Sequence, residues 1–215
     1  MSPEMTRKIF LYGAGGHAKV ILELLEVNER PCAGIYDEYG AATQLLGYPV
    51  SGNLNDDYKA ADSAMIIAVG NNAVRRTLAR KLSANWATII HPSANISSRC
   101  TIGNGTVVMA GVSVNSEVRI GDHVIINTNC SVDHDCVLAN YVHISPNAAL
   151  AGNVQVGEGT HVGIGATVIQ GIKIGKWATI GAGSVIIRDV PDYAVVVGNP
   201  GRILRMNEPE DVAGK

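Results

Sequence analysis

A six-residue repeat runs through the second half of this sequence and constrains the fold more than any other feature. From residue 90 to residue 186, every sixth position is Ile, Val or Leu. These seventeen positions are Ile90, Ile96, Ile102, Val108, Val114, Ile120, Ile126, Val132, Leu138, Ile144, Leu150, Val156, Val162, Val168, Ile174, Ile180 and Ile186. Chance agreement of this kind has a probability on the order of 10⁻¹⁰, so the repeat is real.

Two further columns of the repeat show how each unit is used. The position four residues after each aliphatic residue is mostly small or β-branched, as in Cys130, Cys136 and Val142. A six-residue unit with two inward positions fits short strands that wind into a coil. The position three residues after the aliphatic residue is Gly, Asn or Asp in eleven units, and these residue types best tolerate a positive φ. The predicted corners are Gly105, Gly111, Asn129, Asp135, Asn147, Asn153, Gly159, Gly165, Gly171, Gly183 and Asp189.

The first eighty-odd residues have a different pattern, in which strands and helices alternate. The expected elements are strands over 8–12, 32–36 and 63–69, helices over 18–27 and 73–82, and a glycine loop over 13–17. Asn72 is placed to cap the second helix. The predicted division is a small Rossmann-like α/β domain over 1–88, an all-β parallel β-helix over 89–192, and a C-terminal cap and tail over 193–215.

Composition excludes several classes of function. The 17 basic and 19 acidic side chains are scattered along the 215 residues, so no single-sign field attracts nucleic acid or an anionic membrane. Apolar runs such as Met65 to Val69 are far shorter than a membrane span, and the first ten residues carry charges where a secretion signal is apolar. We expect a cytoplasmic protein without a membrane span. The four cysteines lack paired C-x-x-C spacing and are interpreted as reduced packing thiols.

The glycine loop allows two interpretations. Gly13, Gly15 and Ala18, followed by Asp37, satisfy a dinucleotide fingerprint, which taken alone predicts NAD. Fewer than ninety residues precede the β-helix, however, and a full dinucleotide fold needs a second half, so a single nucleotide fits better. His17 at the helix mouth either contacts a ligand phosphate or sugar or is a solvent-exposed helix residue, and the acidic pair of Asp37 and Glu38 has the same alternatives.

One histidine of the repeat stands out for its surroundings. Residues two after each aliphatic residue point outward, so His134 projects from the coil surface. Gly152 lies eighteen residues further on, one rung of roughly 4.8 Å away, and leaves a gap that a thioester carbonyl could enter. Asp135 is placed to orient the imidazole and raise its basicity, as general-base catalysis requires, unless it merely turns a corner. The stack of His134 and Gly152 favours catalysis.

Two other outward columns suggest a cofactor wall. His143 and His161 are eighteen residues apart and therefore stacked, either as solvent-exposed histidines or beside a bound cofactor. Ile164 is the only large aliphatic residue in an outward column that is otherwise largely polar or small, and Ala182 follows eighteen residues later. An apolar stripe of this kind fits a pantetheine arm or a subunit contact.

The repeat resembles that of hexapeptide-repeat acyltransferases, whose left-handed parallel β-helix uses three hexads per coil. The Gly-Ala-Gly-Gly-His-Ala loop from Gly13, the Gly-Asn-Asn turn from Gly70, the string from Asn127 to Cys136 and the closing Gly-Asn-Pro resemble one subfamily. That subfamily comprises nucleotide-amino-sugar N-acetyltransferases and sialic acid O-acetyltransferase-like proteins. The resemblance implies a homotrimer whose active site lies between protomers. It also implies transfer of an acetyl group from acetyl-CoA to the 4-amino group of a UDP- or dTDP-linked 4-amino-4,6-dideoxysugar. Such a reaction would serve bacterial glycan biosynthesis.

The resemblance also implies a role for each motif residue. His134 would be the base, Asp135 its partner and Gly152 the oxyanion donor, with no metal or acyl-enzyme required. The implied substrate-binding residues are Gly15, Gly16, His17, Asp37, Glu38, Gly70 and Asn127, and the implied acetyl-CoA-binding residues are His143, Ile164 and Ala182. Two positions depart from the family pattern, because Asp135 stands where Glu is frequent and Glu38 where a second Asp is expected.

Three alternatives compete with the N-acetyltransferase hypothesis. The acceptor is a sugar hydroxyl in the first, as in sialic acid O-acetylation. In the second, the β-helix is a trimeric scaffold, the small domain senses a nucleotide and the histidines are incidental. The third is the NAD-dependent interpretation of the glycine loop.

Overall fold

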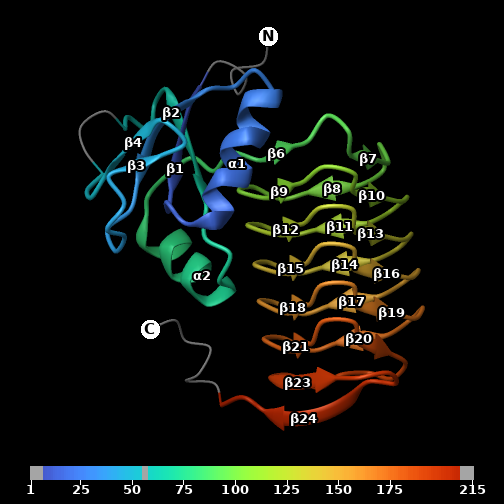
Figure 1. Ribbon diagram of the computed structural model, residues 1–215. Coiled ribbons are helices and arrows are strands. Elements are labelled where there is room, and N and C mark those ends of the chain that lie inside the picture. Colours follow the sequence, from blue (N-terminus) through green and yellow to red (C-terminus); the bar gives the residue numbers. More distant parts are fainter. Residues whose placement is uncertain (1–6, 55–57, 209–215) are drawn as a thin grey trace.

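The computed structural model describes residues 7–54 and 58–208, and the last seven residues of the predicted tail lie outside this range. A small α/β part lies beside one face of a three-sided β-helix (Figure 1). The small part consists of β1 (Lys8–Tyr12), α1 (Gly16–Val27), β2 (Cys32–Tyr36), β3 (Gln44–Leu45), β4 (Tyr48–Ser51), β5 (Ser63–Ile67) and α2 (Asn72–Lys81).

The small part is built around a five-stranded sheet of order β3-β4-β2-β1-β5. The central strand β1 pairs in parallel with both β2 and β5. Four of its five residues are buried, as expected of a parallel strand covered on both faces. The helix α1 begins at Gly16, two residues earlier than predicted, and β5 ends at Ile67, two residues earlier. The predicted βαβ opening is otherwise confirmed.

The β-helix follows the six-residue repeat without interruption. In the described chain its two-residue strands are β6 (Ile89–Ile90), β7 (Asn95–Ile96), β8 (Thr101–Ile102), β9 (Val107–Val108), β10 (Ser113–Val114), β11 (Arg119–Ile120), β12 (Ile125–Ile126), β13 (Ser131–Val132), β14 (Val137–Leu138), β15 (His143–Ile144), β16 (Ala149–Leu150), β17 (Gln155–Val156), β18 (His161–Val162), β19 (Thr167–Val168), β20 (Lys173–Ile174), β21 (Thr179–Ile180) and β22 (Val185–Ile186). Strands eighteen residues apart pair in parallel, so Val114 pairs with Val132 and Val132 with Leu150. Three hexads per coil and the left-handed parallel β-helix are confirmed.

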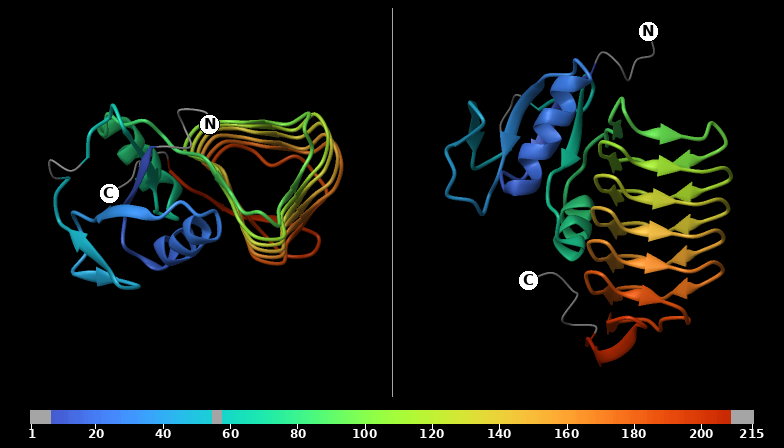
Figure 2. Two further views of the ribbon diagram at one scale, coloured as in Figure 1. Left: turned by 90° about the horizontal axis from the view of Figure 1, so that it is seen from above. Right: turned by 45° about the vertical axis from the view of Figure 1, so that its right-hand side comes forward.

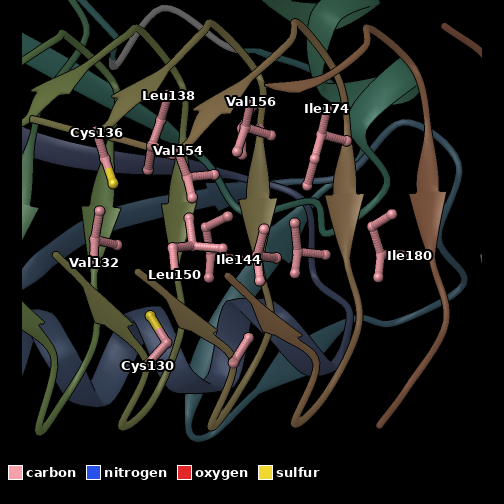
Figure 3. Packing of buried hydrophobic residues seen from close by; sticks show 14 of the residues in the cluster. Cys130, Val132, Cys136, Leu138, Ile144, Leu150, Val154, Val156, Ile174 and Ile180 are labelled. Atoms are coloured by element: carbon pink, nitrogen blue, oxygen red, sulfur yellow. The ribbon is translucent and has the colours of Figure 1, made fainter. Parts of the chain in front are cut away.

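The strands form three sheets that enclose a triangular core (Figure 2). The aliphatic column and the column four residues later both point inward and interdigitate, as Figure 3 shows for residues from Cys130 to Ile180. Cys130 and Cys136 are buried in this core and Cys100 is half-buried beside it. All four cysteines are free, which confirms the prediction of packing thiols.

Ten of the eleven predicted corners have a positive φ. Asp189 is the exception and the prediction was wrong there, because the repeat ends at this point and the Asp189 carboxylate accepts the backbone N–H of Lys173 at 2.8 Å. Bulky residues also take positive φ at corners, and the sequence pattern missed them. One column of corners places the His123 ring on the Tyr141 ring at 5.5 Å and 5°, so stacking accompanies this unfavourable backbone conformation.

Two longer strands continue the sheet at the C-terminal end. The strand β23 (Ala194–Val197) pairs in parallel with β21, and β24 (Arg202–Met206) pairs antiparallel with β23. They extend the face that carries β6, β9, β12, β15, β18 and β21, which we call the docking face because the small part lies against it.

The outward column of the docking face explains how the small part is held. Ile89, Val107 and Ile125 point away from the coil core and share a buried cluster with Leu22 and Leu25 of α1. Lower on the same column the residues are His143 and then His161. The apolar half of the column is therefore a domain interface, and the histidine half lies at its edge.

Candidate functional site

His134 lies at the corner between β13 and β14 and points outward, as predicted. Its Nδ1 is 2.7 Å from Oδ2 of Asp135, and both side chains are 59% exposed. Asp135 has a φ of 61°, so it turns the corner and orients the imidazole at the same time. The two interpretations of Asp135 are thus compatible.

Gly152 lies against the ring of His134. The backbone N–H of Asn153 donates to the His134 carbonyl at 2.8 Å, which sets the two corners one rung apart. A Cβ at Gly152 would lie 2.6 Å from both Cε1 and Nε2 of His134. Only glycine therefore leaves Nε2 room to meet a reacting group.

The carboxylates around His134 raise its pKa. The hydrogen bond to Asp135 is the main cause and the charge of Asp133 adds to it. Asp133 also accepts the backbone N–H of His134 at 2.8 Å and an N–H of Asn115 at 2.7 Å. The sequence pattern assigns no role to Asp133, although it directly precedes the histidine. His134 thus has the geometry of a base held by one carboxylate and tuned by a second.

Asp37, which follows β2, binds the glycine loop through hydrogen bonds to its carboxylate. One oxygen of Asp37 accepts the backbone N–H of Ala14 at 2.8 Å, and the other accepts those of Tyr39 and Gly40 at 3.0 and 2.9 Å. Glu38 instead pairs with Lys81 at 2.7 Å. Gly15 and Gly16 are exposed at the start of α1, so their backbone faces the space in front of the loop.

The N-terminal end of α1 lies next to the histidine half of the docking face. The rings of His17 and His143 lie 6.5 Å apart, and those of His143 and His161 are stacked at 4.8 Å. An amide N–H of Asn127 lies 3.1 Å from Nε2 of His143, and the Ser145 hydroxyl lies 2.7 Å from Nε2 of His161. Two residues named from distant motifs, His17 and His143, thus belong to one cluster.

Burial keeps these imidazoles neutral. The pKa of His17 falls to about 4, mainly by burial and secondarily by the charge of Arg75. Burial also lowers the pKa of His143 to about 2, with further contributions from His161, Arg75 and His17. Both rings are neutral at physiological pH and can each donate one hydrogen bond and accept another.

A cavity of about 490 Å³ opens beside this cluster, between α2 and the docking face. Its lining residues are Gly70, Asn71, Asn72, Ala73, His143, Gly159, His161, Trp177, Ala178 and Thr179.

The structure corrects the residue predicted to cap α2. The N-cap of α2 is Asn71, whose side chain accepts from Ala73 and Val74, while Asn72 is buried and donates to the carbonyls of Gly159 and Thr160.

The structure divides the predicted residues into two groups on opposite sides of the β-helix. In each coil the chain passes from the docking face to a second and then a third sheet, so the corner between the last two lies opposite the docking face (Figure 2). His134, Asp135 and Gly152 occupy that far corner. Asn127, Ile164 and Ala182 occupy the corner next to the docking face, where Ile164 is 57% exposed. His134 and the glycine loop of one chain therefore do not meet.

Within residues 7–54 and 58–208, no helix is long and apolar enough to cross a membrane. The same residues contain no group of three or more His, Cys, Asp or Glu side chains arranged to hold a metal ion.

Two family models match the chain. The model described as the PglD N-terminal domain matches residues 8–82, and the model described as bacterial transferase hexapeptide, six repeats, matches residues 153–188. A curated relative, UDP-N-acetylbacillosamine N-acetyltransferase from Bacillus subtilis (strain 168), is 41% identical over 109 residues. That match covers 47% of this chain and about half (50%) of the relative.

Solved structures match over most of the chain. Perosamine N-acetyltransferase from Caulobacter crescentus, solved as a histidine mutant with CoA and GDP-perosamine, is 39% identical with a TM-score of 0.86. The match covers 91% of this chain and 96% of that one. The acetyltransferase domain of PglB from Neisseria gonorrhoeae FA1090 is 38% identical with a TM-score of 0.86, and the match covers 92% of this chain and 100% of that one. The chain therefore belongs to the hexapeptide-repeat acyltransferase family, which contains the nucleotide-amino-sugar N-acetyltransferases.

Proposed function

We propose that this protein transfers the acetyl group of acetyl-CoA to the amino group of a nucleotide-linked amino sugar. The observation that carries the proposal is His134 held by Asp135 at 2.7 Å beneath a glycine that leaves Nε2 accessible. The relatives described above support the same reaction class, since one is named a UDP-sugar N-acetyltransferase and another was solved with CoA and GDP-perosamine. Those names favour a nitrogen over a hydroxyl acceptor.

The chemistry needs one base and one donor to an oxyanion. As the sugar amine attacks the thioester carbonyl, Nε2 of His134 takes a proton from the amine nitrogen, and Asp135 stabilises the resulting imidazolium. The new C–N bond forms, the C–S bond breaks, and the CoA sulfur leaves and is protonated. We assign the backbone N–H of Gly152 as donor to the carbonyl oxygen while it carries negative charge.

The separation of the two groups supports a site shared between copies of the chain. Gly15, Gly16, His17, Asp37, Glu38 and Gly70 would hold the nucleotide sugar on one protomer, while Asn127, His143, Ile164 and Ala182 would line acetyl-CoA and the acceptor. A base at the far corner reaches them only from a neighbouring protomer. A homotrimer places each far corner beside the corner of the next β-helix that carries Ile164, and its exposed side chain supports such a contact.

The test is an acetylation assay with a panel of UDP-, dTDP- and GDP-linked 4-amino-4,6-dideoxysugars. GDP belongs in the panel because a solved relative carries GDP-perosamine, which the expectation of UDP or dTDP left out. Thiol release and product mass are followed together, with hydroxy analogues of the sugars as a second arm. We expect one acetyl group on an amino sugar, lost in His134→Ala and retained in His91→Ala, a histidine at the first coil. Full activity of His134→Ala would contradict the proposal, and acetylation of hydroxy analogues alone would make the acceptor an oxygen.

A further inference from the structure

Arg75 is the largest fully buried side chain among the described residues, at 1% exposure. It lies on α2, and its guanidinium makes five hydrogen bonds to neutral oxygens. Nε donates to the carbonyl of His123 at 2.8 Å, and Nη2 donates to Oδ1 of Asn72 at 2.8 Å and to the carbonyl of Tyr141 at 2.9 Å. Nη1 donates to the carbonyls of Val69 and Gly70 at 3.0 and 3.2 Å.

These acceptors belong to three separate segments of the chain. One is the stretch 69–72, in which Val69 and Gly70 form the turn between β5 and α2 and Asn72 begins α2. The other two are His123 and Tyr141, which are corners of two successive coils of the β-helix. One planar group thus joins the turn of the small part to the β-helix. A lysine has one nitrogen in place of three and cannot reach acceptors placed around the edge of a guanidinium.

Burying the charged side chain of Arg75 opposes folding, so its presence is unexpected if it only holds the two parts together. Burial lowers the pKa of Arg75 to about 9, so the side chain remains charged at neutral pH. Among the described residues no carboxylate pairs with it, and a buried charge without a counter-ion opposes folding. Apolar packing would join the two parts at lower cost, which suggests that the guanidinium is needed for what it holds in place.

What it holds lies inside the proposed site. The Gly70 carbonyl accepts from Arg75, and Gly70 and His143 line the same cavity. The backbone of Gly70 also acts on the His143 ring to raise its pKa. Nε2 of His143 lies 3.1 Å from the Asn127 amide nitrogen, and the Asn127 side-chain oxygen accepts the backbone N–H of Thr128 at 2.8 Å. The amide nitrogen therefore faces the ring, so the neutral imidazole carries its proton on Nδ1 and accepts at Nε2. The position of the Gly70 turn therefore bears on the orientation of His143.

We propose that Arg75 is a positioning residue of acetyl transfer, which fixes the Gly70 turn against the β-helix so that His143 is presented as the Nδ1–H tautomer beside the glycine loop. The proposal rests on the function proposed above, because Gly70 and His143 are assigned there to the nucleotide sugar and to acetyl-CoA. Arg75 itself touches neither ligand and acts through these two residues.

The test compares Arg75→Lys and Arg75→Met with Arg80→Lys, a matched change at an exposed arginine of the same helix. Loss of buried hydrogen bonds on this scale should lower kcat/KM at least about tenfold in Arg75→Met, mainly through a higher KM for acetyl-CoA and for the nucleotide sugar. Arg75→Lys keeps the charge without the five bonds and should recover only part of this loss. The acid limb of the pH profile, which reports His134 at the far corner, should not move. Folded variants with wild-type KM values for both substrates would overturn the proposal.

A second measurement does not depend on activity, and its first arm uses the wild-type protein alone. Nitrogen-15 NMR of the wild-type protein at neutral pH distinguishes the two imidazole tautomers, and we expect His143 to be the Nδ1–H form and to become a mixture in Arg75→Lys. The opposite tautomer in the wild-type protein would overturn the proposal even if the variants failed to fold. An absence of acetylation across the sugar panel, with the expected tautomer present, would count against the proposed function and not against the role of Arg75 in orienting His143.

Discussion

At the level of single residues, the two kinds of histidine in this protein differ by their surroundings. His134 is exposed and held by carboxylates, which raise its pKa. His17, His123 and His143 are packed beside a buried arginine, and burial is the main cause of their lowered pKa values. One residue type therefore provides an imidazole of raised pKa at the surface and neutral hydrogen-bonding rings in the interior.

Asp135→Asn should move the acid limb of the pH–rate profile. His134 acts as a base only when neutral, so the rate falls as the pH drops below its pKa. Asparagine removes the main cause of the raised pKa, so the acid limb should move to lower pH, while kcat on the plateau should fall at least about tenfold as the imidazolium loses its partner. Steady-state kinetics between pH 5 and 8.5 would measure both effects. Asp133→Asn, which leaves the ring contact intact, should give a smaller shift, and an unmoved limb in Asp135→Asn would refute the assignment.

Gly152→Ala should separate activity from stability. The added Cβ would lie 2.6 Å from Nε2 of His134, and since that ring is exposed it can rotate away at little cost to the fold. We expect kcat to fall at least about tenfold because the reacting nitrogen is displaced, with a stability change within about 0.5 kcal/mol. Kinetics and thermal unfolding would be compared with Gly52→Ala, a glycine with open space around it. A fully active Gly152→Ala protein would show that the gap is not used.

At the level of elements, α2 links the small part to the β-helix. Its first turn carries Asn71, which caps the helix, and Asn72 and Arg75, which bond to carbonyls of the β-helix. Nearby, the guanidinium carbon of Arg76 lies 4.2 Å from the Trp177 ring. The start of the helix thus forms one wall of the cavity, and the β-helix supplies the rest.

Adjacent asparagines at the start of α2 should respond differently to alanine. Asn71→Ala removes a cap with two N–H donors and should lower the free energy of unfolding by about 1 kcal/mol. Asn72→Ala leaves the Gly159 carbonyl and an N–H of Arg75 without their partner, and each such buried group costs about 1–3 kcal/mol. The Thr160 carbonyl keeps the backbone N–H of His143 at 3.0 Å. Urea unfolding followed by circular dichroism would rank the two. A larger loss in Asn71→Ala would contradict the interface described here.

At the scale of the whole molecule, buried neutral histidines should make stability depend on pH. The folded pKa values of His17 and His123 are about 4, whereas an unperturbed histidine has a pKa of 6.5. Between these values the unfolded chain binds more protons, so the free energy of unfolding falls as the pH drops from 6.5 toward 4. The loss is up to about 1.4 kcal/mol per pH unit for each histidine. Urea titrations at pH 7.5, 6 and 5 would measure the slope.

His123→Asn is the control for this slope. Asparagine tolerates the φ of 54° at this corner and does not titrate, so the variant should lose one histidine's share of the pH dependence. Its stability at pH 7.5 should also fall, because the ring stacks on Tyr141. An unchanged slope would mean that the His123 imidazole titrates with the same pKa in the folded and the unfolded chain, which would contradict its burial as the cause of a lowered pKa.

Most of the architecture was predictable because it depends on a short-range repeat in the sequence. A six-residue repeat sets the direction of every side chain in the coil, so the inward columns, ten of eleven corners and the outward position of His134 followed from spacing. The eighteen-residue offset likewise placed Gly152 against His134 and stacked His143 on His161. Each of these relations holds within one coil or between neighbouring coils, where the repeat fixes the geometry.

The tertiary structure decided what depends on contacts between distant segments. Which face of the β-helix receives the small part, and hence the separation of His134 from the glycine loop, follows from apolar contacts of α1 with Ile89, Val107 and Ile125. The burial of Arg75 and the exchange of roles between Asn71 and Asn72 depend on carbonyls 48 to 88 residues away. No local pattern records such a contact, because the repeat gives its three faces the same period and only side-chain complementarity across the interface distinguishes them.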